Sequence, residues 1–325
     1  MRMDAVERMI NRLEAGAATF NCSGYLNSIE PLLRTQLYTR FLFERLKRKE
    51  LYITDLYKND GQNWEQVFFI LLFRFLGAPN NTAAFEKLAH TVTYSIVSRH
   101  LSDPLALEAL LIGASGLLQN YRRDDYTDTL LRDFAYLSQK HHIASPMSAA
   151  EWNMSYTRPF NNPLLRLSQA IAILSQPDFS IDKVLECKSA DDTARLFCHE
   201  ASQYWTTHFI PASQSDDKVK RIGKAKADIL AINAVAPLQF AYGNYIGSER
   251  MFDRALNLID SIPAEQNSKI TVWRNGGLIP RSALDTQSLI QLGDEYCRKI
   301  RCRECPVCKQ ITKTLKEACK LEENK

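Results

Sequence analysis

Four cysteines lie close together near the C-terminus of the chain, in the string CRKIRCRECPVC. They are Cys297, Cys302, Cys305 and Cys308. Thiols at such short spacing converge on one region whatever the local backbone does, so they bind a metal, form disulfides or stay free. In a reducing compartment, clustered cysteines bind metal more often than they pair. The sequence therefore predicts a metal site on these four thiols.

The spacing of the thiols favours an iron–sulfur cluster slightly over zinc. Cys297-x4-Cys302-x2-Cys305 matches the run of three ligands in plant-type iron–sulfur proteins, a match of spacing that implies no ferredoxin fold. Zinc knuckles usually lie a dozen or more residues apart. Basic residues interleave with the cysteines and are expected to favour thiolates and offset their charge: Arg298, Lys299, Arg301 and Arg303.

Cys22 is an alternative fourth ligand, because it would close the site from the opposite end of the chain. An ordinary buried cysteine is the simpler interpretation of this residue. Cys187 and Cys198 lie in apolar helical contexts and are interpreted as small core residues.

Catalytic motifs are missing from the sequence. His199-Glu200 lacks the second histidine of a zinc-protease motif, and no P-loop, G-x-G-x-x-G or G-x-S-x-G string is found. No acid pair or nucleophile–base pair stands out. The chain alone is therefore expected to be non-catalytic rather than an enzyme.

A second group of residues suits an anion or nucleic acid. Its basic members straddle an expected helix N-terminus, where free N–H groups would suit a phosphate, and one arginine lies in an irregular segment. The group consists of Arg158, Lys218, Lys220, Arg221, Lys224 and Lys226. An ordinary basic loop is the alternative, and Arg158 is equally suited to tying two lobes together.

Composition sets the class of protein. The 325 residues are 45% hydrophobic and 24% charged, which is typical of a globular protein with a real core. No apolar run approaches the ~18–20 residues of a membrane span, and the N-terminus has no signal-peptide pattern. We therefore expect a cytoplasmic protein without membrane contact. The net charge of +4 is concentrated at the C-terminus, since residues 297–325 hold nine Lys and Arg against four Glu.

Helical periodicity runs through nearly the whole chain. Helices are expected over about 28–46, 82–98, 223–242 and 285–298, with further starts marked by Asn63, Asp103-Pro104 and Asn162-Pro163. Pro237 should kink the helix that contains it. No convincing hairpin appears. The sequence predicts an all-α fold, an orthogonal or bundle-like array of roughly a dozen helices with a C-terminal cysteine-rich loop.

The expected organisation is consecutive along the chain. Residues 1–145 form an N-terminal helical lobe, residues 146–290 a C-terminal helical lobe, and residues 291–325 the cysteine-rich metal-binding segment and basic tail. The less regular stretch 141–162 is a candidate hinge between the two lobes.

Several strings together resemble an uncharacterised bacterial family, domain-of-unknown-function family 2851, over about residues 22–308. The strings are Asn63-Trp64-Glu65, EALLIGASGLL, Arg158-Pro159 with Asn161 and Pro163, Tyr204-Trp205 with His208, Gly223-Lys224, INAVAPLQFAYG and SALDTQSLIQLGDEYC. No activity comes with this resemblance.

The resemblance implies a context in nucleic-acid processing. Longer members carry an upstream segment similar to restriction-endonuclease-like nucleases, after which this chain is expected to begin, so no catalytic residue is carried over. Members show three cysteines matching Cys297, Cys302 and Cys305; Cys308 is a departure, which leaves the fourth ligand open between Cys308 and Cys22. Some nucleases of the helicase–nuclease and CRISPR-adaptation type close an iron–sulfur cluster with one distant cysteine and three near the C-terminus, an analogy that makes Cys22 worth testing.

The expected function is a non-catalytic helical module of a nuclease-like, nucleic-acid-processing system with a structural iron–sulfur or zinc site. Its expected partners are nucleic acid and a separate nuclease-like chain. A protein–protein scaffold with a structural metal is the first alternative, and a redox or hydrolytic enzyme with an unrecognised site is the second.

Overall fold

The computed structural model describes residues 2–16, 22–155 and 159–323, with the side chains of 7–16, 22–155 and 159–317. The chain forms two compact units. One comprises residues 1–50 and 259–325, and the other comprises residues 51–258. No helix of the described residues combines the length and apolar character that crossing a bilayer requires.

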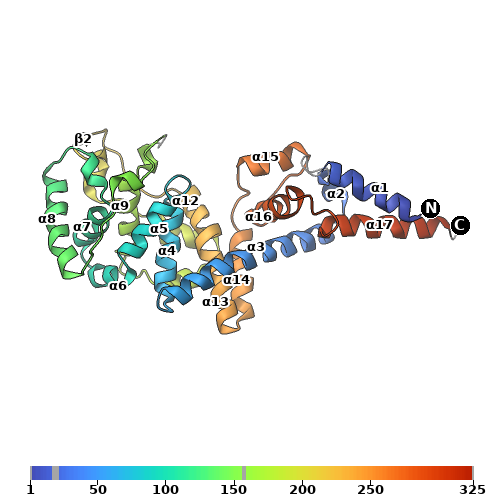
Figure 1. Cartoon of the computed structure of the whole chain (residues 1–325), viewed down its shortest axis with the longest axis horizontal. Helices are drawn as coiled ribbons and strands as arrows, with labels where there is room; N and C mark the ends of the chain where they lie inside the picture. Colours follow the sequence, from blue (N-terminus) through green and yellow to red (C-terminus); the bar gives the residue numbers. More distant parts are fainter. Residues whose placement is uncertain (1, 17–21, 156–158, 324–325) are drawn as a thin grey trace. The chain divides into compact units, whose positions relative to one another are not determined.

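The first unit brings together the two ends of the chain. Its helices are α1 (Arg2–Ala15), α2 (Ser23–Ser28), the first part of α3 (Pro31–Asn59), α15 (Ser268–Asn275), α16 (Ala283–Leu292), the π-helical η8 (Gly293–Cys297) and α17 (Pro306–Glu323). Helices α1 and α17 lie side by side (Figure 1). Leu26, Phe41 and Trp273 are buried in a core that these helices share with the C-terminal cysteines.

Polar contacts fix α3 against α16 in this unit. The Arg45 guanidinium donates to the Gln287 amide oxygen at 2.6 Å, and the Ser288 hydroxyl donates to the Tyr38 carbonyl at 2.7 Å. Buried side chains that bond across two helices fix their register, since a shift would leave each group unsatisfied. The last turns of α16 and η8, which carry Cys297, are positioned in this way.

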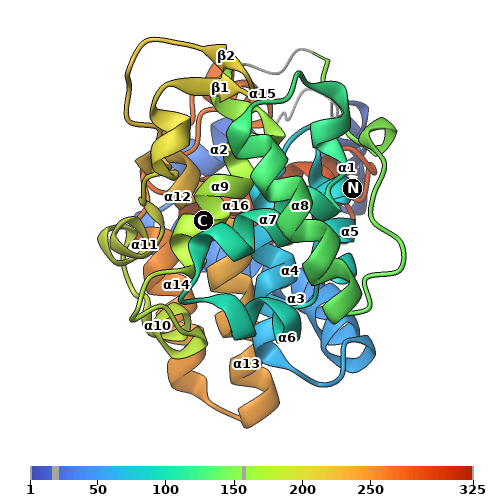
Figure 2. The same ribbon diagram turned by 90° about the vertical axis from the view of Figure 1, so that its left-hand side faces the viewer.

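The second unit is built around α4 and α7. Its helices are α4 (Trp64–Leu76), α5 (Thr82–Thr91), α6 (Tyr94–Val97), η2 (Ser98–His100), α7 (Pro104–Ala114), η3 (Leu117–Asn120), α8 (Asp125–Lys140), η4 (Ala149–Glu151), η5 (Pro159–Asn161), α9 (Pro163–Leu174), α10 (Ile181–Glu186), α11 (Ala190–Phe197), η6 (Gln203–Thr206), α12 (Lys224–Leu230), the π-helical η7 (Ala231–Val235), α13 (Ala236–Ile246) and α14 (Glu249–Asp260), whose last residues belong to the first unit. Helix α7 lies between α8 and α9 (Figure 2).

The all-α prediction is confirmed, with more and shorter elements than the expected dozen. Helix starts agree with their sequence signals: the Asn63 side chain accepts from the backbone N–H groups of Glu65 and Gln66, and the Asp103 carboxylate accepts from that of Ala106. The only sheet in the described part of the chain is a short hairpin, β1 (His208–Ile210) with β2 (Ser213–Gln214). The sequence gives no signal for this hairpin, because both strands are too short to show alternation.

Pro237 acts differently from a simple kink. The expected helix over 223–242 is continuous, but it passes through the π-helical turn η7 directly before α13, where Pro237 lies near the helix start. A π-turn widens the helix and absorbs both the missing N–H and the ring of a proline. Similarly, the stretch expected as one helix over 82–98 is divided into α5 and α6.

The two units differ from the three consecutive segments expected from the sequence. Residues 141–162, the candidate hinge, lie inside the second unit, and residues 156–158 are outside the described residues. The Trp152 indole N–H donates to the Ser115 carbonyl at 2.8 Å, and Asn153 exchanges two hydrogen bonds with Asn81. The described part of the segment is therefore anchored to α7 and to the start of α5.

Close contact between α7 and α8 depends on Gly113. A Cβ atom at this position would lie 2.3 Å from the Phe134 ring and 2.6 Å from its Cβ, so α8 would have to move. We expect Gly113→Ala to lower the free energy of unfolding by about 1–3 kcal/mol, the usual cost of overpacking. Urea denaturation measures this change.

Gly24→Ala is the matched control. No atom lies within 4 Å of a Cβ built at Gly24, which is in helix α2. This substitution should leave stability unchanged or raise it by up to about 1 kcal/mol. Equal urea midpoints for the two variants would contradict the proposed close packing.

Candidate metal centre

The C-terminal cysteines are positioned by two helix ends and the turn between them. Cys297 ends η8, Cys302 and Cys305 lie in the following turns, and Cys308 lies in the first turn of α17, which begins at Pro306. The chain reverses at Ile300, where φ is 52°. A β-branched residue rarely adopts this left-handed conformation, and such strain is found at sites where function fixes the backbone.

All four predicted ligands are buried in the core of the first unit. Their side chains are 4–8% exposed, and Cys22 packs against the same core from the start of α2. The structure thus gathers thiols from both ends of the chain, although no spacing argument links Cys22 to the others. Whether these thiols bind metal stays a prediction.

Hydrogen bonding and burial shift the pKa values of the five thiols in different directions. A hydrogen bond between Cys22 and Cys297 lowers the pKa of Cys22 and, together with burial, raises that of Cys297. Burial raises the pKa of Cys302 to about 11 and that of Cys305 to about 12, and it also raises the pKa of Cys308. At neutral pH the latter three are therefore protonated, and a metal would have to displace their protons.

The donor set suits a thiophilic metal, but the sulfur atoms are not arranged as a finished coordination shell. Within residues 2–16, 22–155 and 159–323, no group of three or more His, Cys, Asp or Glu side chains is arranged so that it could hold a metal ion. A cysteine changes its sulfur position by rotation about one bond between staggered rotamers. Five thiols in one core therefore have the chemistry of a metal site, and binding would require rotamer changes.

The basic residues of the cysteine segment bond to carboxylates rather than to sulfur. Arg298 pairs with Asp294 at 2.6 Å, and Lys299 pairs with Glu295 at the same distance. Arg301 pairs with Glu304, and Arg303 pairs with Glu7 of α1. Nearby carboxylates therefore neutralise most of the positive charge that was expected to offset the thiolates.

The second predicted group is not a continuous basic surface. Lys220 is 1% exposed, donates to the Thr206 carbonyl at 2.6 Å and lies 4.3 Å from the Phe209 ring centre. Lys226 is also buried. Lys218, Arg221 and Lys224 are exposed, and Lys224 pairs with Asp191 at 3.2 Å. Arg158 lies outside the described residues.

Two charged residues in the second unit carry no role in the sequence analysis. Glu108 is 3% exposed; its carboxylate accepts from the hydroxyls of Ser168 at 2.8 Å and Tyr126 at 2.9 Å, and burial raises its pKa. Arg166 is the second of these two charged residues. An acid inside the apolar string EALLIGASGLL was the available signal for Glu108, whereas Arg166 reads as an ordinary polar position of a helix.

Comparison with known proteins gives one match. No curated protein and no solved structure matches the chain. The family model described as "Protein of unknown function (DUF2851)" matches residues 3–268, a range that includes Cys22 and ends before Cys297. The chain belongs to this family.

Proposed function

We propose that this chain is a non-catalytic helical module of a nucleic-acid-processing, nuclease-like system, and that a structural iron–sulfur cluster or zinc ion joins its two ends. Cys297, Cys302 and Cys305 are the core ligands. A metal ion or cluster that is bound by thiolates cross-links distant parts of the chain and so stabilises the fold of a small unit, as structural zinc sites do.

One observation carries the proposal. Four buried cysteines near the C-terminus share one core, and the partly buried Cys22 packs against it from the other end of the sequence, in a unit whose helices come from residues 1–50 and 259–325. Buried free thiols need no partner, but five gathered at one core exceed what packing alone requires, since any small apolar residue would fill the same space. The strained turn at Ile300 between Cys297 and Cys302 supports the same interpretation.

Cys22 and Cys308 compete as the fourth ligand. Cys22 is hydrogen-bonded to Cys297, so a thiol from near the start of the chain is in direct contact with one of the proposed core ligands. Cys308 lies at the wall of a surface groove beside Lys309. These contacts support Cys22 as the fourth ligand, in place of the Cys308 favoured by sequence spacing.

Metal analysis of single variants tests this assignment. The protein is purified anaerobically, and bound iron, sulfide and zinc are measured together with the visible spectrum. We expect Cys22→Ser to lose most of the metal and Cys308→Ser to retain it. A colourless, metal-free and stably folded wild-type protein would remove the metal proposal, and the opposite order of the two variants would assign Cys308.

The nucleic-acid part of the proposal rests on exposed cations. Lys309, Lys313 and Lys316 lie on the exposed side of α17 and line a groove of about 570 Å³ that also contains Cys308. Cations along one helix face suit a phosphate backbone, whose binding weakens as salt rises. The buried Lys220 and Lys226 contribute nothing to such a surface.

Two triple variants separate the candidate surfaces. Lys309, Lys313 and Lys316 are changed to Gln in one, and Lys218, Arg221 and Lys224 in the other. We expect the first to weaken binding to single- or double-stranded DNA or RNA and to reduce the salt slope by up to about three. No binding by the wild-type protein at low salt would remove this part of the proposal.

An exposed aromatic cluster in the second unit favours a protein–protein scaffold as the alternative. The rings of Tyr57 and Trp64 stack at 4.4 Å, and Tyr245, which is 61% exposed, lies 5.1 Å from Tyr57. Exposed aromatic residues are typical of interaction surfaces. A partner that co-purifies after nuclease treatment, and is lost with Tyr245→Ala, would support this alternative.

A further inference from the structure

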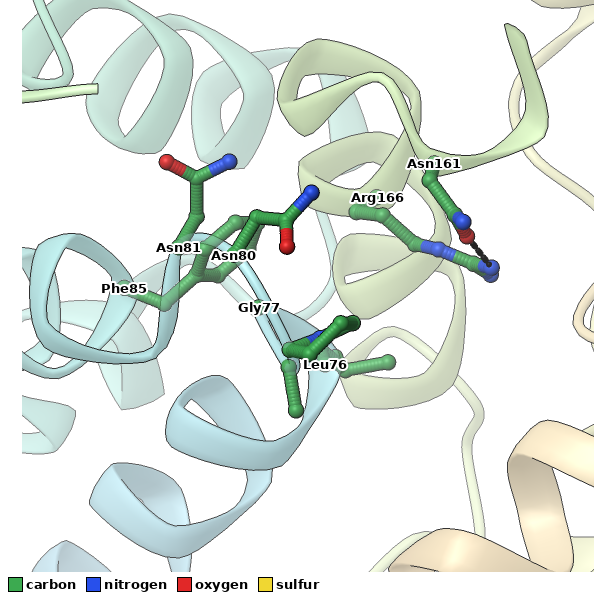
Figure 3. Close-up of a pocket in the computed structure, with 9 residues that line it drawn as sticks. Leu76, Gly77, Asn80, Asn81, Phe85, Asn161 and Arg166 are labelled. Carbon is green, nitrogen blue, oxygen red and sulfur yellow. Dashed lines mark hydrogen bonds between the residues drawn. The ribbon is translucent and has the colours of Figure 1, made fainter. Parts of the chain in front are cut away.

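Two hollows of the second unit differ in the room that they offer. The hollow beside Arg166 has room for about 20 Å³, little more than one water molecule (Figure 3). The Arg166 guanidinium donates to the side-chain oxygens of Asn161 and Gln169, both at 2.8 Å. The nearby Lys226 ammonium is also engaged, since it donates at 3.0–3.2 Å to the carbonyls of Phe75, Leu76 and Ala78. This hollow therefore suits a water molecule rather than a ligand.

A larger groove is lined by α10, α11 and the first turns of α14. It has room for about 650 Å³, within the ~300–1,000 Å³ that is typical of small-molecule sites. A polar contact fixes two of its walls, because Arg254 of α14 donates to the Leu185 carbonyl of α10 at 2.7 Å. Its described lining residues all belong to the second unit, so it shares no residue with the proposed metal centre.

Cations outnumber acids in this groove. Its lining includes five basic and three acidic residues: Lys183, Lys188, Arg195, Arg250 and Arg254 against Asp178, Glu186 and Asp192. Asp192 pairs with Arg195 and also accepts from the Lys188 backbone N–H at 3.0 Å. With this ion pair set aside, four cations share the groove with two acids. An anion with two negative charges would balance the remainder.

The four remaining cations have donors to spare. Among the residues that the structure describes, the side chains of Lys183, Lys188 and Arg250 have no hydrogen bond or ion pair. Arg254 bonds to the Leu185 carbonyl and the Met251 sulfur, which leaves N–H groups of its guanidinium available. Arg250 and Arg254 are one turn apart and so share a face of α14. Donors thus reach the groove from α14 and from the α10 wall.

The rest of the lining suits an organic group. Phe179, Cys187 and Leu196 line the same groove. Burial raises the pKa of Cys187 to about 12, so its thiol stays protonated and is a neutral part of the wall rather than a nucleophile. Phe179 is half-buried, which leaves part of its ring for contact with another flat ring. The groove therefore has the chemistry of a binding site without that of a nucleophilic catalyst.

We propose that this groove binds a nucleoside 5′-monophosphate, with its phosphate at Lys183, Lys188, Arg250 and Arg254 and its base against Phe179. A phosphate monoester carries close to two negative charges at neutral pH, because its second pKa is about 6. This charge matches the excess of cations. A lone phosphate would fill only a small part of the groove, so a ligand of this size needs its organic part. The inference goes beyond the proposed function and involves no reaction.

The test compares two variants with the same charge change. The four common ribonucleoside 5′-monophosphates are each titrated calorimetrically into the wild-type protein, Arg250→Gln and Arg122→Gln. Both arginines are exposed and lack a described side-chain bond, so both variants should keep the wild-type urea midpoint. We expect Arg250→Gln to weaken binding of the preferred nucleotide about tenfold, as for losing a hydrogen bond to a charged group. Arg122, which lies outside the groove lining, should be replaceable without effect.

Glu186→Gln should give a change of the opposite sign. Glu186 is an exposed acid of the same groove, and its carboxylate repels the phosphate. Its removal should tighten nucleotide binding about two- to fivefold, the size expected for one charge near the protein surface. Damage to the fold would only weaken binding, so a tighter complex assigns the phosphate to this groove. Unchanged or weaker binding by Glu186→Gln would contradict that assignment.

Ligand variants separate the parts of the nucleotide and identify its source. The matching nucleoside without phosphate and inorganic phosphate should each bind at least about tenfold more weakly than the nucleotide. The same nucleotide is also tested at the 5′ end of an oligonucleotide. Tighter binding of the oligonucleotide assigns the groove to a nucleic-acid end, and tighter binding of the mononucleotide assigns it to a free ligand. No binding of any nucleotide, or equal effects of Arg250→Gln and Arg122→Gln, would overturn the proposal.

Discussion

Replacing Cys297 with serine should release the bound metal and lower the free energy of unfolding of the anaerobically purified protein by more than about 4 kcal/mol. Losses of this size are exceptional for one substitution and are typical of losing a metal site. Cys297 is the central thiol here, because it contacts Cys22 and ends the helix that precedes the cysteine turns. Metal content and thermal unfolding, measured on the same sample, check this result.

Cys198→Ser is the matched control. Cys198 is half-buried at the end of α11, in the second unit, and is not a member of the cysteine core of the first unit. This variant should keep the wild-type metal content and change stability by less than about 1 kcal/mol. If Cys297→Ser retained both metal and stability, the thiol core would be ordinary packing.

The second large effect is expected at Lys226. Lys226→Met removes the donor for three carbonyls at the end of α4 and leaves them buried. Hydrogen bonds to charged groups are worth about 1.5–3 kcal/mol each, partly offset by relief from burying a charge, so we expect a net loss of about 2–4 kcal/mol at pH 7. Urea denaturation measures it. Lys224→Met, which breaks only an exposed ion pair with Asp191, should cost less than about 1 kcal/mol.

The effect of Lys226→Met should also depend on pH. Burial and the nearby Arg166 lower the pKa of Lys226 to about 7 in the folded protein, against an ordinary value of 10.5. Between pH 7 and pH 10.5 the unfolded wild-type chain binds more protons than the folded protein. The free energy of unfolding of the wild type therefore rises with pH relative to that of the variant. The difference in the free energy of unfolding between the wild type and Lys226→Met should be smallest below pH 7 and grow up to about pH 10.5. A difference that does not change with pH would contradict the depressed pKa.

Local features of the fold were predictable from sequence because they depend on near neighbours. Asn63 and Asp103 begin helices through side chains that bond two or three residues ahead, and such caps are visible in the sequence itself. The apolar periodicity of most helices is likewise local. The short hairpin of β1 and β2 lacked any such signal.

The remaining features depend on contacts between distant residues. Helices α1 and α17 pack together although nearly the whole chain separates them, so a division into consecutive segments could not anticipate the first unit. The basic run from Lys218 to Lys226 suggests an exposed patch, yet its periodicity does not reveal that Lys226 meets the end of α4. The convergence of the C-terminal thiols followed from spacing, whereas their contact with Cys22 needed the fold.

X-ray absorption spectroscopy at the metal edge shows directly whether the cysteines hold a metal. We expect bound iron or zinc in the anaerobically purified protein with an all-sulfur shell, at about 2.3 Å if the metal is zinc, and loss of that shell in Cys297→Ser. A shell of nitrogen or oxygen ligands, or a folded wild-type protein with no bound metal, would contradict it.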